Sequence, residues 1–402
     1  MAYQEVTKTS YGSRLGNSLK GIGSGLLLFV LATVLLWWNE GNAKKKADVI
    51  KEFDKKCVLV EDVSRVDPEL NGKPIHATAV AMSTETLIDP DYDIQVENGI
   101  WLDRSVEYYQ WVEHSSSETK DKIGGGQETV TNYDYTLEWV SSPVNSNTFH
   151  DANYRDLNIT RLTVDNKEIG AKKVNFGAYT LPQGLVSSIP ANDPVALPAD
   201  LGDGVLSHVD GNILYYGENP TSPAVGDVRV TFTQGTGGTA SILAKVKDDT
   251  FEAFTSKAKN NDKTFWMLQM GNRDKDDMVE SAKSANKAML WLLRILGIIL
   301  VIAALRMVFN ILVTLLKVLP PLAKVGELGI NLVTAVVGFI WSLLVILIAW
   351  VAVRPVLAIV LALVIAALIY FLIKKSKAAP EPAPAAAPAA PAAPEAPKTD
   401  AE

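Results

Sequence analysis

Four histidines and several closely spaced carboxylates are the residues of this chain whose types could do chemistry. The histidines are His76, His114, His150 and His208. They do not have the spacing of metal ligands, and the single cysteine, Cys57, gives them no thiolate pair. Asp89, Asp91 and Asp93 lack the glycine and the later glutamate of a calcium loop, so a solvated turn is expected. No phosphate-binding glycine loop, nucleophile elbow or zinc-protease signature occurs. We therefore expect no enzyme, no metal site and no cofactor.

Two further candidates have equally plain explanations. Glu107 and Glu113 share one face of a predicted strand, because side chains on a strand alternate with a period of two. Paired carboxylates could do acid–base work, but a surface strand accounts for them as well. Cys57 is expected to be a small buried apolar residue, and without a second cysteine no intrachain disulfide can form.

Arg306 is more unusual, because it lies near the middle of an apolar run. An ionisable side chain at that depth in a membrane is energetically costly, so it should face other helices or a polar cavity. Asn310 lies one helical turn later, and Arg294 lies near the same face. This polar stripe could meet Asn331 or Ser342. Alternatively, the run begins later or is tilted, and Arg306 reaches the interface.

Apolar runs are the elements that must position these residues, and they cover 21–38, 288–316, 330–353 and 355–373. About 18 apolar residues are enough for a helix to cross the hydrocarbon layer. The first run ends in two tryptophans and shows no small-residue cleavage site at that end, as an uncleaved anchor does. The sequence therefore predicts an α+β membrane protein with four transmembrane helices, one N-terminal and three C-terminal.

Small residues and one arginine are candidates for helix packing. Gly21 and Gly25 in the first run are spaced to let a partner helix approach closely, although glycine is also common in membrane helices. Arg354 is followed by Pro355 and separates the third and fourth runs almost without a loop. A tight hairpin fits this spacing, and a re-entrant or shallow hairpin is the alternative.

Between the first and second runs, residues 39–287 have the composition of a globular domain. Short alternating segments predict a β-rich domain, possibly in two halves at about 58–160 and 161–250, with a final helix that leads into the second run without a break. Residues 1–20 are expected to be a short polar lead on the cytoplasmic side. The Ala/Pro-rich residues 378–402 are expected to form a disordered tail.

Charge gives an orientation and excludes one class of partner. The net charge of −7 argues against nucleic acid, which needs a basic face. Basic residues before the first run, between the second and third, and after the fourth would share one side of the membrane. The lysines between Lys44 and Lys56 oppose this assignment. We predict cytoplasmic termini and a domain in the periplasm or lumen.

Five separated motifs occur in order along the chain. They are residues 10–21, Trp38-Asn39-Glu40-Gly41, and residues 106–113, 226–232 and 349–355. In this order they resemble the TMEM43 (LUMA) family over nearly the whole chain up to about Lys377. The Ala/Pro-rich tail is not part of the resemblance and suggests a bacterial member.

The resemblance implies a fold and a setting. Eukaryotic members are four-span proteins of the endoplasmic reticulum and inner nuclear membrane, with a lumenal domain. They self-associate and are tied to emerin and lamins. No catalytic residues are established for the family, so none carry over. A bacterium has no lamina, so there the domain would face the periplasm and the nuclear role would not transfer.

These observations predict a multi-pass membrane scaffold in the bacterial inner membrane, which self-associates and presents a periplasmic or lumenal domain for partner binding. Its partners would be the lipid bilayer, a second copy of itself and a protein bound by the outer domain. The alternative is a protein that handles a lipid, an ion or a small solute along a polar path lined by Arg306 and Asn310.

Overall fold

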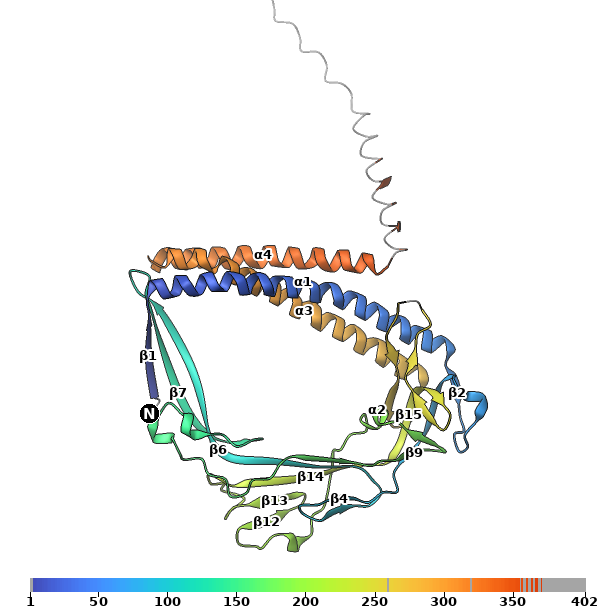
Figure 1. Ribbon diagram of the computed structural model, residues 1–402. Coiled ribbons are helices and arrows are strands. Elements are labelled where there is room, and N and C mark those ends of the chain that lie inside the picture. The colour runs from blue at the N-terminus through green and yellow to red at the C-terminus, as the bar shows by residue number, and fades with distance from the viewer. Residues whose placement is uncertain are drawn as a thin grey trace, which may run out of the picture. The chain divides into compact units, whose positions relative to one another are not determined.

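The computed structural model describes residues 3–354 apart from 259 and 319, together with scattered positions from 356 to 370. It divides into two compact units, Met1–Trp350 and Val351–Glu402. The first unit contains the β-rich domain and three long helices (Figure 1). The helices of the chain are α1 (Tyr11–Lys56), α2 (Gln183–Val186), α3 (Lys275–Leu316) and α4 (Pro320–Ala352). Single 3-10 turns occur at Pro68–Leu70, Ser146–Thr148, Ala152–Tyr154 and Ala199–Leu201.

One sheet has eight strands. Its longest strand is β6 (Gly99–Asp121), which pairs with three of the others. In spatial order the path is β1 (Tyr3–Thr9), β7 (Gln127–Val140), β6 (Gly99–Asp121), β14 (Val228–Thr236), β13 (Ile213–Tyr216) and β12 (Ser207–Asp210). Beside this path, β8 (Lys167–Gly170) pairs with β6 and β11 (Asp193–Pro194) pairs with β14. The first half of β6 is buried beside β14, whereas the second half pairs with β7 and is largely exposed.

The second sheet has seven strands. They are β19 (Met267–Met270), β15 (Gly238–Lys247), β16 (Thr250–Glu252), β10 (Tyr179–Leu181), β9 (Val174–Phe176), β3 (Pro74–Met82) and β2 (Val58–Val60). Two small hairpins complete the domain, β4 (Leu87–Asp89) with β5 (Ile94–Val96) and β17 (Phe254–Thr255) with β18 (Thr264–Phe265).

Both sheets contribute to one hydrophobic core. Leu102 and Phe232 from the first sheet and Ile75, Phe176 and Ile242 from the second are fully buried in the same cluster. Because β14 is followed after one residue by β15, the chain passes directly from one sheet into the other. The two sequence halves therefore share a core.

The N-terminal segment differs from the irregular polar lead that the sequence predicted. Residues 3–9 form β1, which pairs antiparallel with β7 along its whole length. Ser10 then caps α1, because its side chain accepts a hydrogen bond from the backbone N–H of Ser13. Alternating threonines and charged residues favour a strand once a partner edge is present, and the sequence alone does not show that edge.

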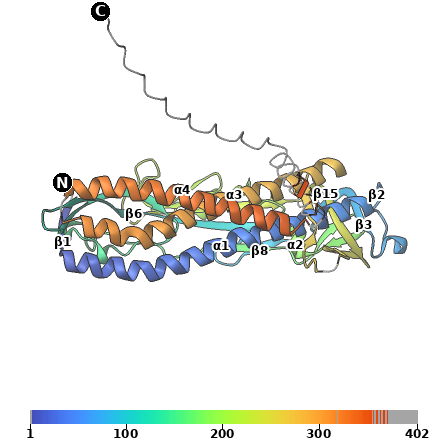
Figure 2. The same cartoon turned by 90° about the horizontal axis from the view of Figure 1, so that it is seen from above.

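The three long helices lie side by side (Figure 2). α1 and α3 are antiparallel, since Ser18 meets Thr314 at one end and Asp54 meets Lys275 at the other. α4 packs beside both through a cluster that includes Ala32, Leu36, Val301 and Val345. α3 is a single helix, so the domain's last helix and the second apolar run are continuous.

Among the described residues, three helices are long and apolar enough to cross a membrane, and they are Tyr11–Lys56, Lys275–Leu316 and Lys324–Ala352. One is N-terminal and two are C-terminal. The fourth predicted span, 355–373, falls outside the described residues except at scattered positions, and the tail at 378–402 lies wholly outside them.

Candidate functional site

A buried ion pair joins α1 to α3 where the apolar part of α1 ends. Glu40 is 1% exposed and accepts two hydrogen bonds from the Arg294 guanidinium, 2.7 Å from Nε to Oε1 and 3.0 Å from Nη2 to Oε2. This two-point geometry fixes the orientation as well as the distance of the two helices. The guanidinium also lies 4.7 Å from the centre of the Trp291 ring, which is a favourable cation–π distance.

The neighbouring residues of the Trp38–Gly41 motif extend this contact. Asn39 is buried, and its side-chain amide donates to the carbonyl oxygen of Leu290 at 3.0 Å. Trp38 is half exposed, as suits a residue at a lipid–water interface. Asn39 and Glu40 of the motif therefore bind α3, whereas Trp38 faces outward. We call Asn39, Glu40 and Arg294 the helix clamp.

Beyond the clamp, α1 and α3 enter the domain. Val49, Ile50 and Phe53 of α1 form a second buried cluster with Met278 and Val279 of α3. The cluster also contains the domain residues Leu243, Phe254 and Phe265. Lys275 closes this end with an ion pair to Asp54 at 2.8 Å. The two helices are therefore anchored against β15 of the second sheet and against the β17–β18 hairpin.

The opposite end of α1 is tied to the domain as well. Arg14 is 7% exposed and pairs with Asp121 at 2.8 Å, at the tip of the β6–β7 hairpin. Its guanidinium also donates to the carbonyl oxygen of Gly125 at 2.9 Å. Lys317, just after α3, lies 3.7 Å from the same aspartate. One hairpin tip therefore contacts the ends of two helices.

One turn along α1, a small polar group continues this contact. The hydroxyl groups of Ser18 and Thr314 are 2.7 Å apart and both residues are buried. The Asn310 side-chain amide donates to the Ser18 hydroxyl at 3.3 Å. Asn310 therefore faces α1, although the sequence suggested a stripe toward α4.

The two candidate glycines of α1 differ in how closely α3 approaches them. A Cβ atom at Gly25 would lie 2.9 Å from the carbonyl oxygen of Ala304, which is too close. A Cβ atom at Gly21 would meet only the Met307 carbonyl oxygen, at an ordinary 3.7 Å. Gly297 of α3 is in turn crowded by Leu36. Close helix contact is thus concentrated at Gly25 and Gly297.

The polar stripe suggested by the sequence is not assembled as one surface. Arg294 faces Glu40, whereas Arg306 is exposed and has no hydrogen-bond or ion-pair partner in the described part of the chain. Ser342 is buried but donates to the carbonyl oxygen of Gly338 in its own helix at 2.7 Å. Arg354 lies just after α4 and is half-buried. These residues do not line one path.

Two of the three aspartates at 89, 91 and 93 are paired with an arginine. Asp89 is fully buried and accepts from Arg104 at 2.7 and 2.8 Å, so it is part of a buried ion pair and not of the expected solvated turn. Asp91 meets the same arginine at 2.7 Å. Within the described residues no group of three or more His, Cys, Asp or Glu side chains could hold a metal ion.

Glu113 joins an aromatic cluster on β6 and β7. Its carboxylate accepts from the Tyr135 hydroxyl at 2.6 Å and lies 2.9 Å from His150 Nδ1. Burial alone would raise the pKa of Glu113, but the hydrogen bonds from Tyr135 and His150 outweigh it and lower the pKa below its usual value. Burial and the same carboxylate raise the pKa of Tyr135 to about 12. Glu107 instead pairs with Arg229, so the two carboxylates do not act together.

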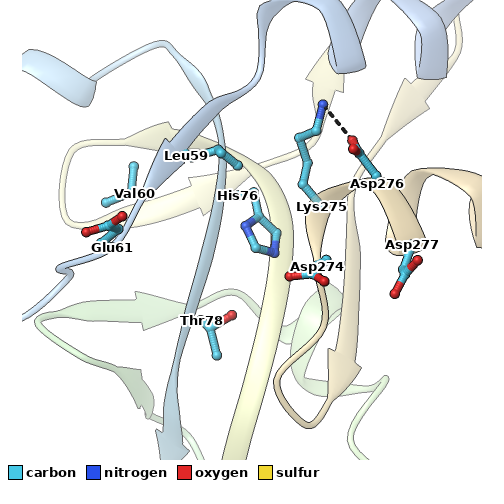
Figure 3. A pocket seen from close by; sticks show the side chains of 9 residues that line it. All are labelled: Leu59, Val60, Glu61, His76, Thr78, Asp274, Lys275, Asp276 and Asp277. Atoms are coloured by element: carbon cyan, nitrogen blue, oxygen red, sulfur yellow. Dashed lines mark ion pairs between the residues drawn. The ribbon is translucent and has the colours of Figure 1, made fainter.

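A pocket of about 530 Å³ lies between β2, β3 and the start of α3 (Figure 3). His76 points into it, and its Nε2 atom lies 2.8 Å from the carbonyl oxygen of Arg273. Lys275 is paired with Asp54 and Asp276. The Thr78 hydroxyl in the lining lies 2.7 Å from the hydroxyl of Ser241 and is not paired with a base, so the described pocket does not show an activated nucleophile. Cys57 lies nearby in sequence, and burial raises the pKa of its thiol to about 12.

Sequence reasoning missed Arg14 and Asp121, which tie the hairpin to the helices. One signal was present, because Arg14 lies four residues before Ser18 and on the face of α1 that also carries Gly21 and Gly25. The partner Asp121 is more than a hundred residues away. Nothing in the local pattern of β6 marks that residue as a contact.

Comparison with known proteins adds a family relation. The model of the family described as TMEM43, Transmembrane protein 43, matches residues 108–355, more than half of the chain. Transmembrane protein 43 of Rattus norvegicus is 29% identical over 357 residues, which are 85% of this chain and 86% of the relative. The Homo sapiens protein of the same name is 28% identical over 364 residues, 87% of this chain and 88% of the relative. A Drosophila melanogaster homolog is 29% identical over 216 residues, 52% of this chain and 55% of the relative. No solved structure matches the chain.

Proposed function

Because the chain belongs to the TMEM43 (Transmembrane protein 43) family of membrane proteins, we propose that it is a membrane scaffold. It self-associates through its helices and presents its β-rich domain to a protein partner. The observation that carries the proposal is the continuity of α1 and α3 from the apolar layer into the domain core. A domain held by two helices that are clamped together keeps a fixed orientation to the bilayer, as a scaffold requires.

An open face of α1 supports self-association. Residues 16, 23, 30 and 37 are spaced seven apart, so they lie on one face of the helix. No atom lies within 4 Å of a Cβ atom built at Gly16 or Gly23. Val30 and Trp37 on the same face are 57% and 49% exposed. Small residues within an apolar face allow a helix of a second copy to pack closely.

The alternative, handling of a lipid, ion or small solute, has no comparable support. It needs polar groups that converge on one path, and Arg294, Arg306 and Asn310 face different surroundings. The bacterial inner membrane and the cytoplasmic termini stay predictions.

Self-association can be tested by replacing two glycines that both face open space but lie on different helices. The mass of the detergent-extracted protein is measured by native mass spectrometry for the wild type, Gly23→Leu and Gly329→Leu. Both glycines have open space around them, but Gly329 lies on α4. We expect a wild-type oligomer that Gly23→Leu dissociates and Gly329→Leu leaves intact. A monomeric wild-type protein would refute the scaffold proposal.

A further inference from the structure

A groove of about 410 Å³ lies beside α1 where its apolar part ends. One wall is a single face of α1, because its residues recur at intervals of three and four along the helix. Along this face the side chains change from apolar to aromatic to polar and basic, in the order Val34, Trp37, Trp38, Gly41, Asn42 and Lys45. The other wall is the loop before β18, which contributes Asp262 and Lys263.

The groove lies on the side of α1 that is turned away from α3. On the opposite side of the same turns, Asn39 and Glu40 are buried and bind α3. In the groove, Val34, Trp37 and Trp38 are each about half exposed. The groove is therefore open to the surroundings of α1 and is separate from the helix clamp.

The loop wall is held against α1 on both sides of Lys263. Two residues earlier, the Asn261 side-chain amide donates to the backbone carbonyl oxygen of Lys45 at 3.0 Å. Two residues later, the Phe265 ring packs edge-on against Phe53 of α1, with ring centres 5.0 Å apart. Because these contacts already fix both walls, a ligand that enters the groove does not have to order the loop.

The charges at the polar end of the groove are unequal. The Lys45 ammonium lies 3.0 Å from the Asp262 carboxylate, and the Lys263 ammonium lies 4.0 Å from the same carboxylate. Among the described residues that line the groove, Asp262 is the only acidic one. Two positive charges therefore share one negative charge, and a phosphodiester with a single negative charge would balance the remainder.

The depth of each wall residue matches the layers of a bilayer leaflet. Trp38 ends the apolar run and is placed at the lipid–water interface, whereas Val34 lies one turn deeper. Lys45 lies seven residues beyond Trp38, about 10 Å along the helix. The headgroup layer is roughly 5–7 Å thick on each side of the hydrocarbon, and a lysine side chain is long enough to reach back into it.

We propose that this groove binds one anionic phospholipid from the leaflet on the side of the β-rich domain. The phosphate lies between Lys45 and Lys263, and the start of an acyl chain covers Trp37 and Val34. A volume of about 410 Å³ is within the usual range of a small-molecule site. A soluble phosphate would leave the apolar end of the groove empty, so the lipid fits the whole site better.

This site does not depend on the proposed scaffold function. Trp37 borders both the groove and the open face of α1 that was assigned to self-association, so it is left unchanged in the test. The test replaces only the charged residues at the polar end and measures bound lipid. Self-association and lipid binding can therefore fail separately.

Lipid binding can be measured on the full-length protein in detergent. The protein is titrated with phosphatidylglycerol or with phosphatidylcholine, and native mass spectrometry counts the lipids bound per chain. We expect tighter binding of phosphatidylglycerol, and we expect Lys45→Gln with Lys263→Gln to weaken it about tenfold, since each lysine attracts an anionic lipid by about 1 kcal/mol. The control, Lys46→Gln with Lys51→Gln, removes the same charge from exposed positions of α1 outside the groove and should change little.

Three results would overturn the proposal. Equal losses in the two double variants would show that any surface lysine attracts the lipid. Equal binding of the two lipids by the wild type would show that the headgroup charge is not recognised. Release of bound phosphatidylglycerol by glycerol 3-phosphate would show a site for a soluble phosphate.

Asp262→Asn separates a lipid site from a merely structural ion-pair network. It removes the carboxylate that competes with the phosphate for both lysines. We expect this variant to bind phosphatidylglycerol more tightly than the wild type. Weaker binding would mean that the two ion pairs serve to hold the loop, and it would contradict the proposal.

Discussion

At the scale of single residues, the clamp and not a catalytic group is the chemically distinctive part of this protein. Glu40 and Arg294 are a buried pair in which each charge needs the other, because neither can be solvated where it lies. Arg306 looked equally special in the sequence but is exposed. The two arginines therefore make a matched comparison on one helix.

Replacing Arg294 by leucine leaves the Glu40 carboxylate buried without a partner. We expect Arg294→Leu to lower the free energy of unfolding by about 3–5 kcal/mol. Adding Glu40→Leu should recover much of the loss, because the unpaired charge is then removed as well. Arg306→Leu is the control and should change stability by less than about 0.5 kcal/mol. Denaturant unfolding in detergent micelles measures all four proteins, and equal effects at the two arginines would refute the clamp.

Glu113 makes stability depend on pH. Its pKa is lowered in the folded protein, so the unfolded chain binds more protons in acid. The stabilisation it provides is therefore complete above the unfolded pKa, near 4.3, and is lost as pH falls through the lower folded pKa. We expect the advantage of the wild type over Glu113→Gln in thermal unfolding to shrink between pH 6 and pH 3, values chosen to bracket about 4.3.

At the scale of elements, the packing of α1 on α3 is set by where glycine is needed. Gly25 touches the backbone of α3, whereas Gly23, two residues earlier, faces open space. The spacing of glycines in the sequence indicated close helix approach without showing which face would make it. Only the position of the partner helix separates the two glycines.

Alanine substitutions at the same two glycines should change the stability in opposite directions. Gly25→Ala should destabilise the protein by about 1–3 kcal/mol, because α3 must move away from the new methyl group. Gly23→Ala should be neutral or stabilise by up to about 1 kcal/mol, because alanine favours the helix and meets nothing. Thermal unfolding in micelles compares them. A loss of stability at Gly23→Ala alone would contradict the packing described.

Much of the architecture could be predicted from the sequence, and the failures have one cause. Apolar runs and alternation locate the long helices and the β-rich domain, because both depend on local periodicity. The strand β1, the Arg14–Asp121 pair and the Arg104–Asp89 pair depend on residues distant in the chain or on an edge supplied by another strand. The polar stripe failed to assemble for the same reason, since helix rotation is decided by the partner.

At the scale of the whole molecule, both ends of α1 are attached to the β-rich domain. β1 and the Arg14–Asp121 pair hold its N-terminal end, and the cluster around Phe53 holds its C-terminal end. Together with the contact of α1 on α3, these attachments fix the domain relative to the helices, as the proposed scaffold requires.

The number of copies in one particle tests the scaffold proposal most directly. Native mass spectrometry of the wild-type protein in lipid nanodiscs reports that number from the mass. The proposal predicts two or more copies in a particle. A single copy in every particle would contradict it.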